Sequence, residues 1–257
     1  MPDEDDLATA DFDRPNPARI HDWLLGGSLN TPIDREVVTS APHWLPVLRD
    51  IARDNRAFLG DVVRRVLDRN VRQFLDLGSG LPTRGAVHHQ VRHHPDATVV
   101  YVDNDPATVA RANVILDTTP QAVGVHADLR DPHEVLGTAT ARRLLRLEQP
   151  LCLIAIDVLD TLLDSDEPAR LLATYGEALA PGSVLALTHV TTWPRTTGDT
   201  DRTRFWERRQ PRSPQVVRRW GTGWEPLPPG PPDRPIRYGT PDGPVSAEIA
   251  RFVFTKP

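Results

Sequence analysis

The chain has 257 residues, a net charge of −5, 39% hydrophobic and 25% charged residues, which is the composition of an ordinary globular protein. The negative charge argues against binding of nucleic acid by overall charge. The single cysteine, Cys152, excludes an internal disulfide and predicts a cytoplasmic location, and the most apolar run, LCLIAIDVL, is too short to span a membrane.

The first part of the chain is expected to hold a tail and two helices. Residues 1–15 are acidic and are predicted to be disordered. NPARIHDWLLGG predicts a helix that starts near Asn16, with Pro17 in its first position, and ends at Gly26–Gly27. From Leu45 to Arg69 apolar residues recur with a helical period, which predicts one long amphipathic helix.

After residue 70 the pattern changes to short apolar runs separated by helical stretches. The runs are VRQFLDL, ATVVYVD, AVGVHAD, LCLIAID and SVLALTH. Such runs are typical of strands buried on both faces, and their alternation with helices predicts a parallel α/β sheet. Asp105 before Pro106 and Asp131 before Pro132 predict helix starts.

A ligand turn is predicted after the first of these strands. Gly78 and Gly80 stand where the strand gives way to a helix, and glycine lets a ligand approach the backbone closely. Asp103 ends the second strand, where a carboxylate can accept both hydroxyl protons of a ribose. Together they indicate a cofactor that contains a nucleoside. The alternative is a tight turn with Asp103 as a helix cap.

The residues around this turn favour S-adenosylmethionine over NAD. A dinucleotide fingerprint needs a third glycine where this chain has Thr83. Asp76, just before the turn, would repel a pyrophosphate but suits a sulfonium and an ammonium. Asp128 ends the third strand, where it can reach an adenine amino group.

The segments ARIHDWLLGG, RQFLDLGSGLPT, VVYVDNDP and ADLRDP, in this order, resemble the actinobacterial family of S-adenosylmethionine-dependent methyltransferases once catalogued as a domain of unknown function, DUF574. The resemblance implies a class I methyltransferase fold. This fold is Rossmann-like, with a seven-stranded, mostly parallel sheet, flanking helices and an N-terminal helical lid. The lid would span residues 16–70 and the cofactor-binding catalytic domain residues 71–257.

The resemblance also implies residue roles. The methionine part would be lined by Gly78, Ser79 and Gly80, the ribose held by Asp103 and Asn104, and the adenine framed by Asp128 and Leu129. Two places depart from the family, which commonly has Lys-Asp-Asn at Ser28-Leu29-Asn30 and Leu-His-Phe at Leu159-Asp160-Thr161. These departures indicate an unusual substrate or loss of methyl transfer.

Residues near the strand ends are the candidates for chemistry. Asp157, Asp160 and His189 are expected at or just past the ends of the fourth and fifth strands, facing the crevice, Asp157 on the cofactor and the other two as possible bases. The alternatives are a helix cap for Asp160 and a satisfied polar residue for His189. His21, in the lid, is expected over the cofactor, although a core or surface histidine is an equal alternative.

Trp193, Phe205 and Trp206 follow the fifth strand and are expected to form an aromatic wall for the methyl acceptor. The surrounding arginines, in RTRFWERRQPRSPQVVRRW, also fit RNA binding but are more typical of an amphipathic helix pair. His88, His89, His93 and His94 are interpreted as a solvated helix face, and no metal site is expected.

The prediction is a small-molecule methyltransferase, in specialised metabolism. Two alternatives stay open. One is a cofactor-binding protein that catalyses a rearrangement or cyclisation, or regulates; the other is an NAD-linked oxidoreductase. The sequence does not determine the oligomeric state.

Overall fold

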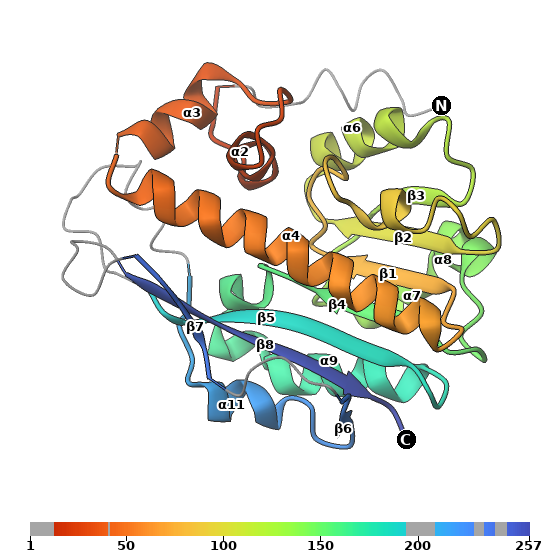
Figure 1. The fold of residues 1–257 in the computed structure, drawn as a ribbon. Coiled ribbons are helices and arrows are strands. Elements are labelled where there is room, and N and C mark those ends of the chain that lie inside the picture. Colours follow the sequence, from red (N-terminus) through yellow and green to blue (C-terminus); the bar gives the residue numbers. More distant parts are fainter. Residues whose placement is uncertain (1–12, 41, 194–208, 229–233, 240–245) are drawn as a thin grey trace.

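The computed structural model describes residues 13–40, 42–193, 209–228, 234–239 and 246–257. One mixed sheet runs through it in the order β3-β2-β1-β4-β5-β8-β6, and β7 also pairs with β8 (Figure 1). The parallel strands are β1 (Gln73–Leu77), β2 (Thr98–Asp103), β3 (Ala122–His126), β4 (Cys152–Ala155) and β5 (Val184–Thr192). The antiparallel strands are β6 (Glu225–Pro226), β7 (Ile236–Tyr238) and β8 (Ala247–Thr255).

The α/β fold and all five parallel strands are confirmed. The described sheet has eight strands rather than the expected seven, because two very short strands, β6 and β7, each pair with β8. β1 and β4 lie side by side in the sheet. The chain continues from β1 to β2 toward one edge of the sheet and from β4 to β5 toward the other edge, so the strand order reverses between β1 and β4. In such sheets the ligand crevice lies at the carboxyl ends of the strands beside this switch point.

Three helices, α2, α6 and α7, begin directly after the predicted cap residues Asn16, Asp105 and Asp131. The described helices are α2 (Pro17–Leu24), α3 (Pro32–Thr39), α4 (Trp44–Asp68), α5 (Val87–Gln90), α6 (Pro106–Leu116), α7 (Pro132–Gly137), α8 (Ala139–Leu144), α9 (Pro168–Ala178) and α11 (Pro214–Arg219). The side chains of Asn16 and Asp105 each accept a backbone hydrogen bond at the start of α2 and α6. These contacts satisfy N–H groups that a helix leaves unpaired in its first turn.

Three apolar clusters hold the layers together. One face of the sheet packs against α7, α8, α9 and α11, and the other packs against α4, α5 and α6. A third cluster joins α2, α3 and the first half of α4 to the ends of β5, β7 and β8. Figure 1 shows α2 and α3 beside this end of α4, beyond the body of the sheet. Residues 1–12, most of the expected disordered tail, lie outside the described part.

Candidate active site

The turn after β1 requires residues without side chains. Gly78 and Gly80 have φ of +62° and +60°, a conformation that residues with a Cβ rarely adopt. A Cβ on Gly78 would lie 2.2 Å from Cγ2 of Val158, in the loop after β4. A Cβ on Gly80 would lie 3.2 Å from the Cβ of Ala18, in α2. The turn therefore lies between the β4 loop and the N-terminal helix.

Asp103 ends β2 and connects the loops that follow β1 and β2. Its Oδ2 accepts a hydrogen bond from the N–H of Gly80 at 2.9 Å, and its Oδ1 accepts one from the N–H of Asp105 at 3.0 Å. Burial raises the pKa of Asp103, although both hydrogen bonds oppose the shift. A carboxylate has about four acceptor positions, so each oxygen can also accept a hydrogen bond from a ligand hydroxyl.

Asp76 lies within β1 on the sheet face that α4 covers. Phe74, two residues earlier, packs in the cluster under α4, and side chains two apart on a strand share a face. Asp76 is only 7% exposed. Burial raises the pKa of its carboxyl to about 7; the nearby Arg56 guanidinium opposes this shift and Asp103 adds to it. Asp76 therefore changes charge near neutral pH, directly before the glycine turn.

Beyond β4, two carboxylates share one guanidinium. Arg209 Nη1 donates to Asp157 Oδ1 at 2.6 Å and to Asp160 Oδ2 at 2.5 Å. Burial alone would raise the pKa of Asp157, but the Arg209 charge outweighs it and holds this pKa below its ordinary value. Asp160 is 1% exposed, and its Oδ1 has no hydrogen-bond partner among the described residues. Asp157 and Asp160 thus share the Arg209 cation, and Asp160 Oδ1 is a buried acceptor atom without a donor among the described residues.

Arg209 belongs to the arginine-rich stretch, and no local feature of the sequence sets it apart from the other arginines there. It follows Asp160 by 49 residues and lies in a stretch without helix or strand. Its guanidinium also lies over the Trp193 ring, with Cζ 4.8 Å from the ring centre. The helix-cap alternative for Asp160 is wrong, because Asp160 lies in a single 3-10 turn, Leu159–Thr161, and α9 begins only at Pro168.

Helix α2 lies against the loops at the carboxyl ends of the central strands. Asn16 Nδ2 donates to Asp105 Oδ2 at 2.8 Å, which ties the start of α2 to the start of α6. Burial lowers the pKa of His21 to about 4; Arg56 adds to this shift, whereas Asp157 opposes it. His21 is therefore neutral at neutral pH and lies near both Arg56 and the β4 loop.

A buried carboxylate holds the turn after α2. Asp22 is 1% exposed, and its Oδ2 accepts a hydrogen bond from the N–H of Leu29 at 2.8 Å. A Cβ on Gly27 would lie 2.1 Å from Asp22 Oδ1, so only glycine fits beside this carboxylate. The double glycine at 26 and 27 is thus a close-packed turn in this structure.

His189 is buried inside β5 rather than at its end. The strand continues to Thr192, because Val190 and Thr192 still pair with β8. The two ring nitrogens of His189 lie 2.7 Å from the carbonyl oxygen of Val190 and 3.3 Å from Arg212 Nη1. Burial lowers its pKa. This geometry matches the alternative of a satisfied polar residue.

The residues expected around ribose and adenine lie after β2 and β3, on the same side as Asp103. Asn104 is exposed directly after β2. Asp128 accepts hydrogen bonds from the Arg130 guanidinium, which lower its pKa. Leu129 is nearly buried, and its carbonyl accepts a hydrogen bond from the Tyr175 hydroxyl at 2.9 Å. Because β2 and β3 are parallel neighbours, Asn104, Asp128 and Leu129 all lie at the carboxyl-end edge of the sheet.

Of the aromatic residues expected to contact the acceptor, only Trp193 is described. It lies next to the Asp157–Arg209–Asp160 group and packs on Trp44, with ring centres 4.9 Å apart. Phe205 and Trp206 lie outside the described residues. Helix α11 is the only described helix of the arginine-rich stretch.

A small cavity of about 90 Å³ lies between the N-terminal segment and the start of α6. The N-terminal segment contributes Arg19, Ser28, Leu29, Asn30 and Thr31, and the other wall consists of Leu81, Asp105, Ala107, Thr108 and Arg111. Both residues that differ from the family's Lys-Asp-Asn, Ser28 and Leu29, therefore lie beside the loop that follows the glycine turn.

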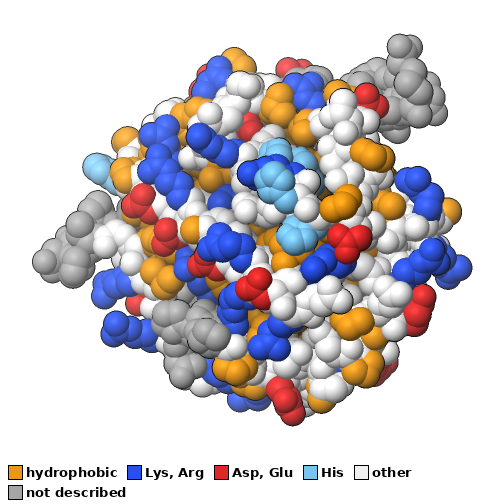
Figure 2. All heavy atoms as spheres, turned by 45° about the vertical axis from the view of Figure 1, so that its right-hand side comes forward, with side chains coloured by type: hydrophobic (Ala, Val, Ile, Leu, Met, Phe, Trp, Pro, Cys, Tyr) orange, Lys and Arg blue, Asp and Glu red, His pale blue; other side chains and the backbone are white. Residues whose placement is uncertain are grey.

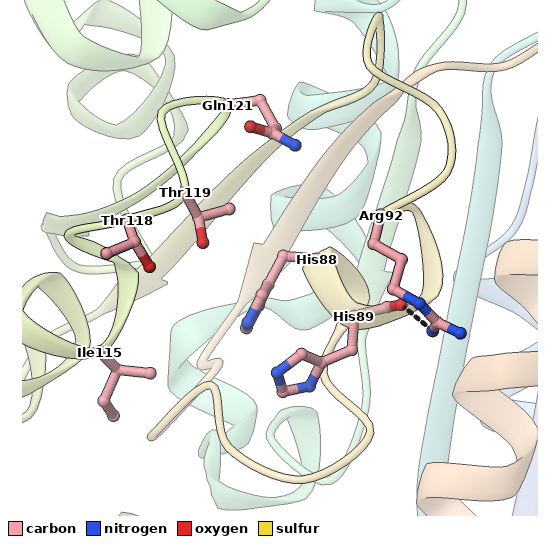
Figure 3. A pocket seen from close by; sticks show the side chains of 7 residues that line it. All are labelled: His88, His89, Arg92, Ile115, Thr118, Thr119 and Gln121. Carbon is pink, nitrogen blue, oxygen red and sulfur yellow. Dashed lines mark hydrogen bonds between the residues drawn. The ribbon is translucent and has the colours of Figure 1, made fainter.

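The histidines after this turn do not form a solvated helix face. Helix α5 ends at Gln90, so His89 and His93 do not share a helix. His88 is buried: its ring Nδ1 lies 2.9 Å from the Tyr101 hydroxyl, and burial lowers its pKa to about 4. Figure 2 shows histidine side chains gathered on one face. His88 and His89 line a polar hollow of about 310 Å³, together with Arg92, Ile115, Thr118, Thr119 and Gln121 (Figure 3).

No group of three or more potential metal ligands occurs among the residues that the structure describes. Within the same residues, no helix is both long and apolar enough to cross a membrane.

Comparison with known proteins decides the family. Residues 3–232 match the family model described as S-adenosyl methyltransferase. The chain belongs to this family. Its cofactor is accordingly S-adenosylmethionine, as predicted, and the oxidoreductase alternative is wrong. A comparison with curated proteins gives no match.

Solved structures agree with this assignment. The methyltransferase is similar to a DUF574 family protein from Streptomyces avermitilis, with 27% identity, a TM-score of 0.79, and coverage of 96% of this chain and 99% of that one. It also resembles a provisionally assigned methyltransferase from Thermobifida fusca, with 30% identity, a TM-score of 0.77 and 96% of each chain covered. The magnesium protoporphyrin IX methyltransferase from Synechocystis, solved with bound cofactor, shares the fold at 14% identity, with a TM-score of 0.52 over 87% of this chain and 94% of that one.

The residues of the methyltransferase fit this cofactor. The glycine turn offers backbone without side chains, and Asp103 has free acceptor positions for a ribose. Buried polar atoms without a hydrogen-bond partner among the described residues include Asp22 Oδ1, Arg56 Nε and Asp160 Oδ1. Because proteins normally pair buried polar atoms, such exceptions are typical of a site that binds a polar ligand.

Proposed function

We propose that this methyltransferase acts on a small molecule of specialised metabolism. The observation that carries the proposal is the open acceptor atom Oδ1 of Asp160, which is buried beside Asp157, Arg209 and Trp193. A buried, single acceptor position suits a small molecule that enters the crevice better than the exposed surface of a macromolecule. The metabolic setting is inferred from the actinobacterial genomes in which the similar proteins occur.

The chain's own residues would position the reactants. The bound cofactor supplies a methyl group that its sulfonium already activates, so most of the acceleration can come from orientation. Asp76 and Asp157 would face the cationic parts of the cofactor, and Asp103 would hold the ribose. Asp160 Oδ1 would accept a hydrogen bond from the acceptor's O–H or N–H and take its proton where the acceptor is a weak acid.

His189 is the weaker candidate for a base, because protein groups lie against both of its ring nitrogens. We therefore assign the proton-accepting role to Asp160 and a supporting role to His189. His21, which is neutral, would cover the cofactor from α2.

A second function is favoured by Arg209. Its guanidinium bonds to both carboxylates at the place where an acceptor would bind, which suits a protein that holds the cofactor without transferring its methyl. Such a protein would regulate, or catalyse a rearrangement or cyclisation.

One experiment separates these functions. The purified protein is incubated with methyl-labelled S-adenosylmethionine and an actinobacterial cell extract, and the products are divided by molecular mass. Label in the small-molecule fraction is expected. Label confined to protein or nucleic acid would contradict the proposed acceptor class. Cofactor that binds but keeps its label would favour the second function.

Within the expected lid region of residues 16–70, residues 16–40 are expected to close over the cofactor and the acceptor. Because α2 contacts the glycine turn through Ala18 and α6 through Asn16, bound cofactor should slow amide exchange throughout residues 16–40. Hydrogen exchange with and without S-adenosylhomocysteine measures this, with α9 as the control that should not change. Equal exchange in residues 16–40 under both conditions would mean that α2 and α3 are fixed structural helices.

Cofactor affinity is expected to depend on pH through Asp76. Burial raises the pKa of Asp76 to about 7 in the empty site, and a ligand ammonium favours the ionised form, so binding releases a proton below that pH. Affinity for S-adenosylhomocysteine should therefore rise by up to about tenfold per pH unit as pH approaches 7, and then level off.

Calorimetry across this range tests the dependence, and Asp76→Asn should flatten it. The ionisable groups that face Asp76 are Arg56 from α4, Tyr101 and Asp103 from β2, and Cys152 from β4. Burial raises the pKa of Tyr101 and Cys152 further above neutrality, so neither titrates here. A slope that persists in Asp76→Asn would assign the proton to Asp103.

A further inference from the structure

Arg56 is a charged, partly exposed residue in register with the buried stripe of α4. Ala52 precedes it by one helical turn and Leu59 follows it by nearly one turn, and both are buried. Its stem runs beside the loop that follows the glycine turn, because a Cβ on Gly85 would lie 3.8 Å from Arg56 Cδ. The stem of Arg56 therefore lies beside the glycine-turn loop, and its Nε is buried there.

The Arg56 guanidinium has no partner in the described chain. Its Nε is buried without a hydrogen bond, and no ion pair within 4 Å joins it to a described carboxylate. Asp76, Asp157 and Asp22 act on it through space. A buried cation normally has a hydrogen-bonded anion beside it, because desolvation of an unpaired charge is costly. The anion that completes this site is therefore expected to come from a ligand.

The surroundings restrict what that ligand is. With Asp76, Asp103 and Asp157 in the same crevice, a simple anion would be repelled. A ligand that carries positive groups together with one anionic group meets both requirements. S-adenosylmethionine has a sulfonium, an ammonium and a single carboxylate, on its methionine part.

We infer that Arg56 binds the methionine carboxylate of the cofactor. This assignment rests on the cofactor site proposed above and makes Arg56 the residue that distinguishes the complete cofactor from adenosyl compounds without an amino acid. Asp76 lies on the sheet face that α4 covers, so the two side chains would take the opposite charges of the amino acid head. Arg56 is a positioning residue: by fixing this head it would orient the sulfonium toward the β4 loop.

The test compares two ligands by calorimetry: S-adenosylhomocysteine, which has the amino acid head, and methylthioadenosine, which lacks it. In Arg56→Gln, affinity for S-adenosylhomocysteine should fall about 10- to 100-fold, while affinity for methylthioadenosine should change less than about twofold. Arg56→Lys keeps the charge without the planar fork and should recover part of the loss. Arg53→Gln, an exposed position on the same helix, is the matched control and should bind both ligands normally.

Each outcome decides the assignment. Equal losses for both ligands in Arg56→Gln would overturn it and leave Arg56 a purely structural residue. If the wild type binds neither ligand, the cofactor site itself is wrong. If Arg56→Gln does not fold, the wild type is titrated with decarboxylated S-adenosylhomocysteine: a loss of about 10- to 100-fold supports the carboxylate contact, and unchanged affinity overturns it.

Discussion

Replacing Gly80 with valine is expected to remove binding of S-adenosylhomocysteine, with a loss of more than about 100-fold, or about 3 kcal/mol. The φ of +60° at Gly80 is strained for any residue with a Cβ and most of all for a β-branched one. The added Cβ would also lie 3.2 Å from the Cβ of Ala18 and push α2 away from the turn. Both effects act where the methionine part of the cofactor is expected.

A control variant separates the effect of backbone strain on stability from the expected loss of cofactor binding. Gly223 has φ of +86°, and a Cβ there would meet no atom within 4 Å, so Gly223→Val has comparable strain in open space. This control should lower the free energy of unfolding but leave binding unchanged. Normal calorimetric affinity in Gly80→Val would show that the cofactor does not approach this turn.

Replacing Asp103 with alanine is expected to weaken cofactor binding about 10- to 100-fold, because hydrogen bonds to a charged group contribute about 1.5–3 kcal/mol. In the structure the same carboxylate also accepts hydrogen bonds from the N–H groups of Gly80 and Asp105. The substitution could therefore act by loosening two loops as well as by losing the ribose.

Ligand analogues distinguish these two causes. The wild type should bind the 2′-deoxy and 3′-deoxy forms of S-adenosylhomocysteine more weakly than the parent, whereas Asp103→Ala should bind all three with nearly the same affinity. If the variant discriminates among them as strongly as the wild type does, Asp103 does not hold the ribose, and its role is confined to the loops.

The parts of the fold that local sequence determines were predictable. Proline after a capping acid marks the start of α6 and α7, and the predicted glycine turn after β1 lies beside Asp103. The same reasoning failed for the histidines after Gly85, because α5 stops after one turn and His88 turns inward to Tyr101. The periodic spacing of hydrophobic residues does not reveal where a helix of only one turn ends.

Two arginines complete the candidate site and were not predicted. Arg209 reaches Asp157 and Asp160 from a segment without regular structure, so only tertiary packing places it there. Arg56, in contrast, can be recognised from the sequence pattern of α4. A charged residue in register with Ala52 and Leu59 interrupts the buried stripe of α4, and this mismatch between pattern and residue type is typical of a functional position.

A crystal structure of the protein with S-adenosylhomocysteine tests the central claim most directly. We expect the methionine part over Gly78–Gly80, the ribose hydroxyls on Asp103, and the thioether sulfur directed toward Asp157 and Asp160. A ligand bound elsewhere, for example in the polar hollow beside His88 and Arg92, with the glycine turn empty, would contradict it.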